Sequence, residues 1–430
     1  RNTPGYAPYS KKRSNFLIMK HRFLCAFLVL FLGGVSSWAA APKAGARFVQ
    51  DRFCIGAFWL TFPMDKDADQ RFAEIAEANF TVVYGPVDGF SVEAVKRHLA
   101  LCQKHGLKAI AHCRAPVDQW PDGPACWGYR LWDEPPAKMF GDLAKRLAEV
   151  RKLRPGRLGD INLYPDYAKP HQMGVETYDE YVSLFLATVD VDVLCMDHYP
   201  IFKPQQDSRH RYCRNLETMR KFSLKKGIPF WNYFNTAPFG PHTDPTEAQI
   251  RWQIYTSIAY GAKGVNYFTY GTPKTFEFPK GSSILRRDGT RTRHWQQAKR
   301  INGAIKNLGP TLMKLTNTGM YRVEPKDDPA KMLKDCPITN LKRVAVDPLP
   351  DYLIGTFKHA DGRRAVMLNN YRFAYTAWPT VEFDVPTDQV REVDQKTGRV
   401  VPIYDDSPNM EGLQVSLDAG AGRLFLLPRK

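Results

Sequence analysis

The chain has 430 residues, of which 43% are hydrophobic and 13% aromatic, enough to bury one large core and a smaller second one. These proportions exclude an intrinsically disordered or fibrous protein. The formal net charge is +17, but the basic residues are scattered and no run resembles a nucleic-acid-binding patch, so no nucleic-acid partner is expected. We interpret the charge as a solvated basic surface, with acidic substrates or anionic surfaces as the alternative.

The first 40 residues have the features of a targeting segment. After Met19 come basic residues at 20–22, an apolar run at 23–32 and a small-x-small cleavage site at 37–39, a pattern typical of a secretory signal peptide. The apolar run is too short to span a bilayer, so we expect a secreted or periplasmic protein with no stable membrane span in its mature chain. Residues 1–18 are expected to be upstream sequence.

Seven cysteines follow this segment, an odd number, so at least one thiol is predicted to stay free. Cys113 with Cys126 is the one pair that we would test as a disulfide. No Cys or His spacing is typical of a zinc site, and nothing in the sequence requires a metal or an organic cofactor.

From residue 53 onward, short apolar runs alternate with helical patterns, which is typical of a parallel sheet with crossover helices. Strands are predicted at 54–60, 81–84, 108–113, 129–133, 160–163, 192–196, 229–233 and 264–269. Helices are predicted at 69–78, 92–105, 138–154, 178–188, 246–260 and 293–308. This count predicts the α/β class and a (β/α)8 TIM barrel. A doubly wound open sheet is the alternative, but no Gly-rich phosphate loop follows the first strand.

The pattern changes near residue 317 to short alternating segments, such as 352–357, 365–368 and 423–427, separated by turn signals such as Asp361-Gly362. These segments predict a small antiparallel β-sandwich. We therefore expect an upstream and signal segment at 1–40, a catalytic barrel at 50–316 and a C-terminal β-sandwich domain at 317–430.

The stretch 127–136 is the most informative part of the chain. Aromatic and apolar residues lead to the adjacent carboxylates Asp133 and Glu134, and two prolines then end the strand before a helical pattern. The carboxyl end of a barrel strand is where this fold carries its catalytic groups. A helix N-cap is the alternative, since carboxylates favour the first turn, but capping accounts for only one of the two carboxylates.

The other predicted strand ends carry aromatic, amide, carboxylate and imidazole groups. Because the carboxyl ends of parallel strands share one mouth, these side chains are expected to converge. They are Trp59, Tyr84, His112, Arg114, Asn162, Tyr164, Asp197, His198, Tyr199, Trp231, Tyr233, Asn235, Tyr267 and Tyr270. Aromatic rings that pack on sugar faces and polar groups that bind hydroxyls predict an oligo- or polysaccharide substrate.

Three motifs carry a resemblance to a known group of enzymes. The Trp-Asp-Glu-Pro at 132–135 resembles the Asn-Glu-Pro that carries the acid/base in clan A glycoside hydrolases, which are (β/α)8 barrels. Residues 287–292, with the helix and the Leu-Gly-Pro-Thr-Leu that follow, resemble the close of the barrel in family 42 β-galactosidases, and 419–425 is similar to the last strand of their appended sandwich. The resemblance implies that Glu134 is the general acid and that Asp133 replaces the asparagine that contacts the sugar 2-hydroxyl.

The sequence departs from that pattern in two ways. Strict alternation would direct Asp133 and Glu134 to opposite faces, so both serve one site only if the strand ends or bulges there. Clan A enzymes also place a nucleophilic Glu after strand seven, where residues 230–235 contain no carboxylate. Asp197 is our candidate for the second carboxylate, as base or nucleophile, with Asp166 and Glu247 as weaker choices.

Several functions remain open at this stage. An Asp197-activated water predicts inversion, whereas the adjacent Asp133-Glu134 pair resembles that of family 20 hexosaminidases, which implies a substrate-assisted route. A non-catalytic carbohydrate-binding protein on a degenerate barrel and a lyase using Tyr199 or His198 as base are the alternatives from other classes.

Overall fold

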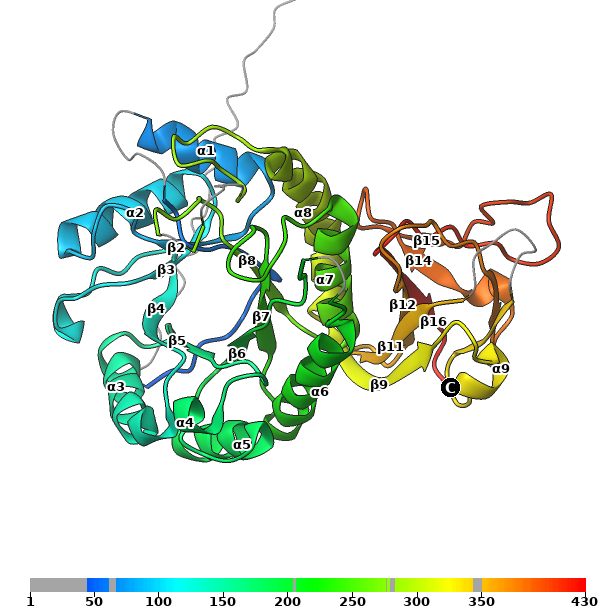
Figure 1. Cartoon of the computed structure of the whole chain (residues 1–430), viewed down its shortest axis with the longest axis horizontal. Helices are drawn as coiled ribbons and strands as arrows, with labels where there is room; N and C mark the ends of the chain where they lie inside the picture. Colours follow the sequence, from blue (N-terminus) through cyan, green and yellow to red (C-terminus); the bar gives the residue numbers. More distant parts are fainter. Residues whose placement is uncertain (1–44, 62–66, 204–205, 276, 279–282, 343–349) are drawn as a thin grey trace, which may run out of the picture. The chain divides into compact units, whose positions relative to one another are not determined.

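The computed structural model describes residues 45–61, 67–203, 206–275, 277–278, 283–342 and 350–430, and the chain is shown in Figure 1. The predicted signal peptide at 19–39 lies outside these residues. Within the described ranges, no helix has both the length and the apolar character that crossing a membrane requires.

The core of the fold is a closed barrel of eight parallel strands paired in chain order, β1 to β8. The predicted fold class is therefore confirmed. The strands are β1 Cys54–Ala57, β2 Val82–Gly85, β3 Lys108–Ala111, β4 Cys126–Asp133, β5 Leu158–Leu163, β6 Leu194–Asp197, β7 Phe230–Asn235 and β8 Gly264–Phe268.

Helices surround the barrel on its outside, as Figure 1 shows. They are α1 Ala68–Glu77, α2 Val92–Lys104, α3 Phe140–Leu153, α4 Pro170–Met173, α5 Tyr178–Thr188, α6 Arg209–Lys226, α7 Glu247–Ala259 and α8 Arg293–Leu312, with 3-10 turns at Val117–Gln119 and Ala137–Met139. The helix α6 was missed by the sequence analysis, because eight of its 18 residues are Lys, Arg or Glu and its buried apolar stripe, which includes Tyr212, Leu216 and Met219, is narrow.

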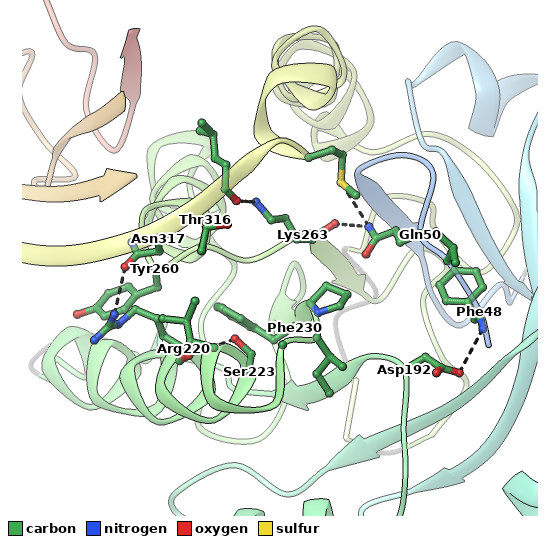
Figure 2. Close-up of a pocket in the computed structure, with 18 of the residues that line it drawn as sticks. Phe48, Gln50, Asp192, Arg220, Ser223, Phe230, Tyr260, Lys263, Thr316 and Asn317 are labelled. Atoms are coloured by element: carbon green, nitrogen blue, oxygen red, sulfur yellow. Dashed lines mark hydrogen bonds between the residues drawn. The ribbon is translucent and has the colours of Figure 1, made fainter. Parts of the chain in front are cut away.

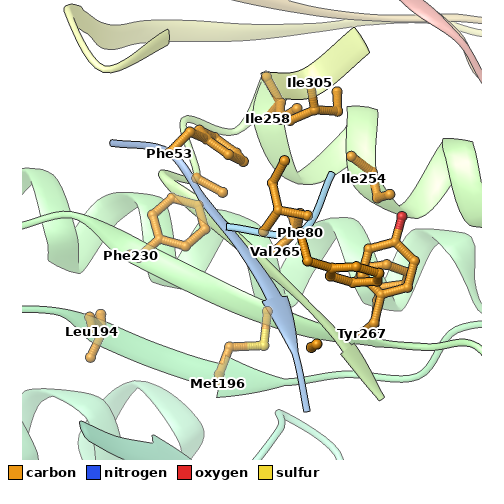
Figure 3. Close-up of a cluster of buried hydrophobic side chains, with 14 of the residues drawn as sticks. Phe53, Phe80, Leu194, Met196, Phe230, Ile254, Ile258, Val265, Tyr267 and Ile305 are labelled. Atoms are coloured by element: carbon orange, nitrogen blue, oxygen red, sulfur yellow. The ribbon is translucent and has the colours of Figure 1, made fainter. Parts of the chain in front are cut away.

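Alternation along each strand separates the outer core from the barrel interior. On β7, Phe230 and Phe234 point outward into the core beneath the helices, whereas Trp231 and Tyr233 belong to the interior cluster. Figure 3 shows part of the outer core, where strand residues such as Val265 meet helix residues such as Ile254. Strands that are buried on both faces have nearly continuous apolar sequences, which is why they could be predicted from the sequence.

The C-terminal part forms a six-stranded antiparallel sheet in the order β15-β14-β16-β12-β11-β9 and a two-stranded sheet of β10 and β13. The elements are β9 Leu315–Val323, α9 Pro329–Met332, β10 Ile338–Lys342, β11 Tyr352–His359, β12 Arg364–Asn370, β13 Thr380–Phe383, the 3-10 turn Thr387–Gln389, β14 Arg391–Val393, β15 Val400–Pro402 and β16 Gly422–Leu427. Leu341 of β10 and Val381 of β13 share a core with Phe425 of β16, so the two sheets pack face to face as predicted for a sandwich.

The other face of the large sheet packs on the barrel. Leu424 and Leu426 of β16 belong to the barrel's outer core, whereas their neighbour Phe425 faces the sandwich core. At the junction, the Asn369 side-chain amide donates a 2.8 Å hydrogen bond to the Tyr255 carbonyl oxygen of α7. The central strands β11, β12 and β16 of the large sheet are thus largely buried on both faces.

All seven cysteines of the described residues are free thiols. The tentative disulfide between Cys113 and Cys126 is therefore wrong. Both side chains are buried among apolar neighbours, where a cysteine behaves as a small hydrophobic residue.

Gly128 in β4 offers a test of how closely β4 and β5 pack. A Cβ atom there would lie 2.2 Å from the carbonyl oxygen of Leu158, so we expect Gly128→Ala to lower the free energy of unfolding by about 1–3 kcal/mol. Gly141→Ala in α3 is the matched control, because no atom lies within 4 Å of its added methyl group and the helix gains propensity. Urea unfolding measures both, and equal stability of the two variants would contradict the packing argument.

Candidate active site

The end of β4 brings both adjacent carboxylates to the same cavity. The pairing of β4 with β5 shifts between Arg130 and Trp132, so one extra residue on β4 forms a bulge. The strand then ends at Asp133, and Glu134 takes a left-handed conformation with φ 49°. Strict alternation would direct Asp133 and Glu134 to opposite faces. Because the strand bulges and then turns at Glu134, both side chains can line the same cavity.

Left-handed backbone is costly for a residue with a Cβ atom and is concentrated at functional sites. Two of the four non-glycine residues with this conformation in the described chain, Trp59 (φ 57°) and Glu134, line the same cavity. The Glu134 turn is held by its backbone N–H, which donates a 2.8 Å hydrogen bond to the Asn162 carbonyl oxygen on β5.

The cavity has a volume of about 230 Å³ and lies at the carboxyl ends of the strands. Its lining combines three carboxylates with aromatic rings, one guanidinium and one amide. The residues are Phe58, Trp59, Arg130, Asp133, Glu134, Asn162, Asp197, Tyr199, Tyr233 and Phe268. The three predicted catalytic residues are therefore together, with the predicted Trp59, Asn162, Tyr199 and Tyr233 beside them.

Asn162 joins the three carboxylate residues. Its side-chain amide donates to Asp133 Oδ1 at 3.1 Å and to Asp197 Oδ1 at 3.0 Å, while its backbone holds Glu134. The Asn162 side chain is nearly fully buried, and its bond to Asp197 forms away from bulk water, where a hydrogen bond fixes geometry most strongly.

Arg130 is a site residue that the sequence analysis missed. Its guanidinium points into the barrel and makes ion pairs with Asp160 at 2.8 Å and with Asp133 at 2.6 Å. It also donates a 2.8 Å hydrogen bond to the hydroxyl oxygen of Tyr233. The available sequence signal was a lone charge in an otherwise apolar and aromatic run, because such a charge needs a buried partner.

The pKa values of Glu134 and Asp197 are both raised. Burial, followed by the nearby charges of Asp197 and Asp133, raises the pKa of Glu134 to about 8. Burial and then Asp133 raise the pKa of Asp197 to about 7, although hydrogen bonds from Asn162 and Tyr199 oppose this rise by stabilising the anion. No such hydrogen bond reaches the Glu134 carboxyl group from the described residues, so Glu134 holds its proton more tightly than Asp197.

A second hollow of about 660 Å³ adjoins the carboxylate cavity and shares Phe58, Trp59, Arg130, Asp133 and Phe268 with it. The predicted Tyr84 and His112 line this larger hollow, together with Phe90 and Trp132. The predicted Tyr164 lies close enough to Glu134, Asp133 and Asp197 that their negative charges, in addition to burial, raise the pKa of its hydroxyl group.

Two predicted binding residues, His198 and Tyr267, point away from the mouth, so their prediction as binding residues is wrong. His198 follows the inward-facing Asp197, so its ring points outward, is fully buried and has Nδ1 2.9 Å from Asn215 Oδ1. Tyr267 likewise faces the helices and donates a 2.7 Å hydrogen bond to Asn302 Oδ1. The side taken by a strand-end residue depends on the register, which the sequence did not provide.

Two further predicted residues are buried without lining either hollow. Trp231 faces the interior at a deeper level, where it stacks on Trp127 with ring centroids 6.1 Å apart and donates to Gln50 Oε1. Asn235, at the end of β7, is fully buried, and its backbone N–H donates to Gln253 Oε1 at 3.2 Å.

The weaker carboxylate candidates belong to ion pairs on the outside of the barrel. Asp166 pairs with Arg211 and Arg214 of α6, and Glu247 pairs with Arg300 of α8. Of the three candidates for the second carboxylate, Asp197 is thus the one that lines the cavity with Glu134 and Asp133. Among the described residues there is also no group of three or more His, Cys, Asp or Glu side chains arranged to hold a metal ion.

Another cavity, of about 560 Å³, lies at the opposite end of the strands (Figure 2). There, Lys263 Nζ donates to the carbonyl oxygens of Leu312 and Leu315, at the end of α8 and the start of β9, and Gln50 donates to the Lys263 carbonyl oxygen. Because these polar groups satisfy one another and Asp133, Glu134 and Asp197 lie at the other end of the strands, we assign this cavity a structural role at the junction of barrel and sheet.

The chain matches a glycoside hydrolase family model described as Beta-galactosidase (family 42) over residues 171–308. This match and the closed barrel confirm the resemblance to clan A glycoside hydrolases near family 42. A search of curated proteins found no match.

Solved structures similar to this chain include two β-galactosidases. The enzyme from Bacillus circulans sp. alkalophilus has 9% identity and a TM-score of 0.56, with 87% of this chain and 99% of that chain covered. Gan42B, a GH42 β-galactosidase from G. stearothermophilus solved as a catalytic mutant, has 8% identity and a TM-score of 0.54, with 90% and 100% covered. At these identities the likeness concerns the fold.

A third similar structure is the β-galactosidase from the psychrophilic Marinomonas ef1, with 10% identity, a TM-score of 0.44 and 60% of this chain covered. The chain spans 60% of the length of that protein.

The raised pKa of Glu134 predicts a pH dependence of stability. The folded pKa of about 8 exceeds the ordinary value of 4.5, so between these pH values the folded state keeps a proton that the unfolded state has lost. The stabilisation is complete below pH 4.5 and is lost as the pH rises to about 8, by on the order of 1 kcal/mol per pH unit at most. Asp197 acts in the same direction.

Urea unfolding of wild type and Glu134→Gln at pH 5, 6, 7 and 8 tests this. We expect the variant to lose less stability than wild type as the pH rises, because Gln does not titrate. Glu149→Gln, on the outer surface of α3, is the control and should follow wild type. If the free energy of unfolding changes with pH in the same way in all three proteins, the raised pKa of Glu134 is contradicted.

Proposed function

We propose that this protein hydrolyses an O-glycosidic bond, with Glu134 as general acid and Asp197 as base or nucleophile. The observation that carries the proposal is the unequal environment of two carboxyl groups in one cavity. Asp197 accepts hydrogen bonds from Asn162 and Tyr199, which favour its anion, whereas the Glu134 carboxyl group is partly buried and has no donor of this kind among the described residues. A protonated acid beside an ionised carboxylate is what glycosidic cleavage needs.

In the proposed reaction, Glu134 transfers its proton to the glycosidic oxygen as the bond from that oxygen to the anomeric carbon breaks. In an inverting enzyme, Asp197 takes a proton from the water that attacks the anomeric carbon. In a retaining enzyme, Asp197 attacks that carbon itself, and Glu134 then activates water to release the sugar. Both routes leave Asp197, on β6, with the task that clan A enzymes give to a carboxylate on strand seven.

A substrate-assisted route is the second candidate, and the exposure of Asp133 favours it. The Asp133 side chain is 60% exposed and lies in the same cavity as Glu134, so it is accessible to the N–H group of a 2-acetamido sugar. On that route Asp197 is not needed as a nucleophile. Release of product from 2-acetamido substrates only, with activity retained in Asp197→Asn, would select it.

The relatives suggest the first substrates to test. Because the matched family and the similar structures are described as β-galactosidases, β-galactosides are the first probes. The aromatic lining of the two hollows, with Trp59 and Trp132 partly exposed, suits the packing of sugar faces on rings.

We predict that Glu134→Gln lowers kcat about 100-fold or more on glycosides with a poor leaving group, because the departing oxygen then lacks a proton donor. The loss should be much smaller on an aryl glycoside with an acidic phenol, which leaves unaided. Asp197→Asn should lose activity on both substrates, since it acts on the anomeric carbon. Rates for each substrate, with product anomers followed by NMR, measure these effects.

Glu247→Gln is the matched control, because Glu247 pairs with Arg300 outside the mouth and its loss should leave turnover unchanged. Wild-type rates in Glu134→Gln on a cleaved substrate would refute the assignment. Binding of glycans that stay intact after long incubation would instead favour a non-catalytic carbohydrate-binding protein, and unsaturated products absorbing in the ultraviolet would indicate a lyase.

Asn162 is proposed to position the carboxylates. Asn162→Ala removes a hydrogen bond to the Asp197 anion, so we expect the pKa of Asp197 to rise and the acidic limb of the pH–kcat profile to move to higher pH, with turnover about ten-fold lower. The pH–rate profile separates this role from a merely structural one, which would lower activity equally at every pH. An unshifted acidic limb would rule the positioning role out.

We also propose that the protein is exported through the segment 19–39, with maturation near residue 40. The sequence pattern of basic start, apolar run and small-x-small site supports this. N-terminal sequencing of protein recovered from the extracellular or periplasmic fraction tests it, and recovery only of uncleaved intracellular chain would reject it.

A further inference from the structure

The larger hollow beside the carboxylate cavity has a basic rim. His112 and Arg114 follow β3, and both contact the ring of Phe90, which lines the hollow. The His112 ring centroid lies 4.4 Å from that of Phe90, and the Arg114 guanidinium carbon lies 4.8 Å from the Phe90 centroid. Phe90 thus holds two nitrogen-rich groups beside the same hollow.

The acidic groups near this rim are already engaged. Asp133, which lines both hollows, is ion-paired with Arg130 at 2.6 Å, and Asp88 is paired with Arg97. Within the described parts of the chain, Arg114 makes no ion pair and His112 has no side-chain hydrogen bond. The pKa of His112 is lowered, first by burial and then by the positive charges of Arg114 and Arg130, so the local potential at the rim is positive.

We propose that this rim binds a carboxylate or sulfate group carried by a sugar unit next to the bond that is cleaved. Arg114 offers a planar fork of donors that matches such oxyanions, and the aromatic wall of the hollow covers the face of the same sugar. As a choice of substrate class this deepens the proposed hydrolase function, but binding at the rim does not depend on cleavage. The protein's preferred glycan is then an acidic one.

The test uses the full chain with Glu134→Gln, so that ligands stay intact during calorimetric titration. The probes are two pairs with equal backbones: an oligogalacturonate with its methyl ester, and a sulfated galactose oligosaccharide with its desulfated form. We expect one charged member to bind at least about ten-fold more tightly than its neutral partner at low salt, and to lose this advantage as NaCl is raised. Which pair shows the preference tells carboxylate from sulfate.

Adding Arg114→Gln should abolish the preference, and His112→Asn should weaken it, whereas the affinity for the neutral members stays within about two-fold. Arg146→Gln is the matched control, because Arg146 stacks on Trp120 at 4.9 Å in the same way, but Trp120, unlike Phe90, lines neither hollow. The variant that combines Glu134→Gln with Arg146→Gln should show the same preference for charged ligands as Glu134→Gln alone. Equal or absent binding of charged and neutral members, or a preference that survives Arg114→Gln, overturns the proposal.

Hydrolysis of neutral aryl glycosides by wild type is measured separately. If these glycosides are cleaved but binding shows no preference for charged ligands, the proposed hydrolase function stands and the proposed basic subsite is rejected. If charged ligands bind preferentially but no probe is cleaved, the subsite stands and the hydrolase function is rejected.

Discussion

The ion pairs and hydrogen bond of the buried Arg130 guanidinium are the interactions on which the arrangement of the barrel interior depends. A charge enclosed among aromatic rings is stable only when it is paired and hydrogen-bonded, and Arg130 meets this need with Asp160 deeper in the barrel, Asp133 at the mouth and the Tyr233 hydroxyl on β7. These contacts tie β4 to β5 and β7 and hold Asp133 at the edge of the cavity. They also neutralise part of the negative charge there, so that three carboxyl groups can share a small volume.

The proposed chemistry depends on how the remaining carboxyl groups, Glu134 and Asp197, differ in their surroundings. Asp133 is paired with Arg130, so Glu134 and Asp197 are the carboxyl groups that compete for a proton. Burial raises the pKa of both and favours their neutral forms. Hydrogen bonds from Asn162 and Tyr199 favour the anion at Asp197, and the turn at Glu134 directs its carboxyl group into an environment without such donors. The bulge in β4 is the structural condition for this, because regular alternation would send Glu134 to the helix layer.

Much of this arrangement follows from the sequence, and the failures have identifiable physical causes. Periodicity located all eight strands, because a strand buried on both faces is a short apolar run bounded by turn residues. It missed α6, whose charged surface conceals its apolar stripe. The strand-four motif and Asp197 were found from residue type, but His198 and Tyr267 were assigned to the mouth although they face the helices. The side that a strand-end residue faces depends on register and bulges, which are set by tertiary pairing.

The missing carboxylate on β7 is consistent with this charge distribution. Within Phe230–Asn235 the inward-facing position nearest the cavity is Tyr233, whose hydroxyl oxygen accepts a hydrogen bond from Arg130. A glutamate there would add a fourth carboxyl group beside Asp133, Glu134 and Asp197, with only one buried guanidinium in the cavity lining to balance them. A neutral phenol adds no further negative charge there. In the proposed mechanism the two-carboxylate site is therefore built from β4 and β6, where hydrogen bonds from Asn162 and Tyr199 favour the Asp197 anion.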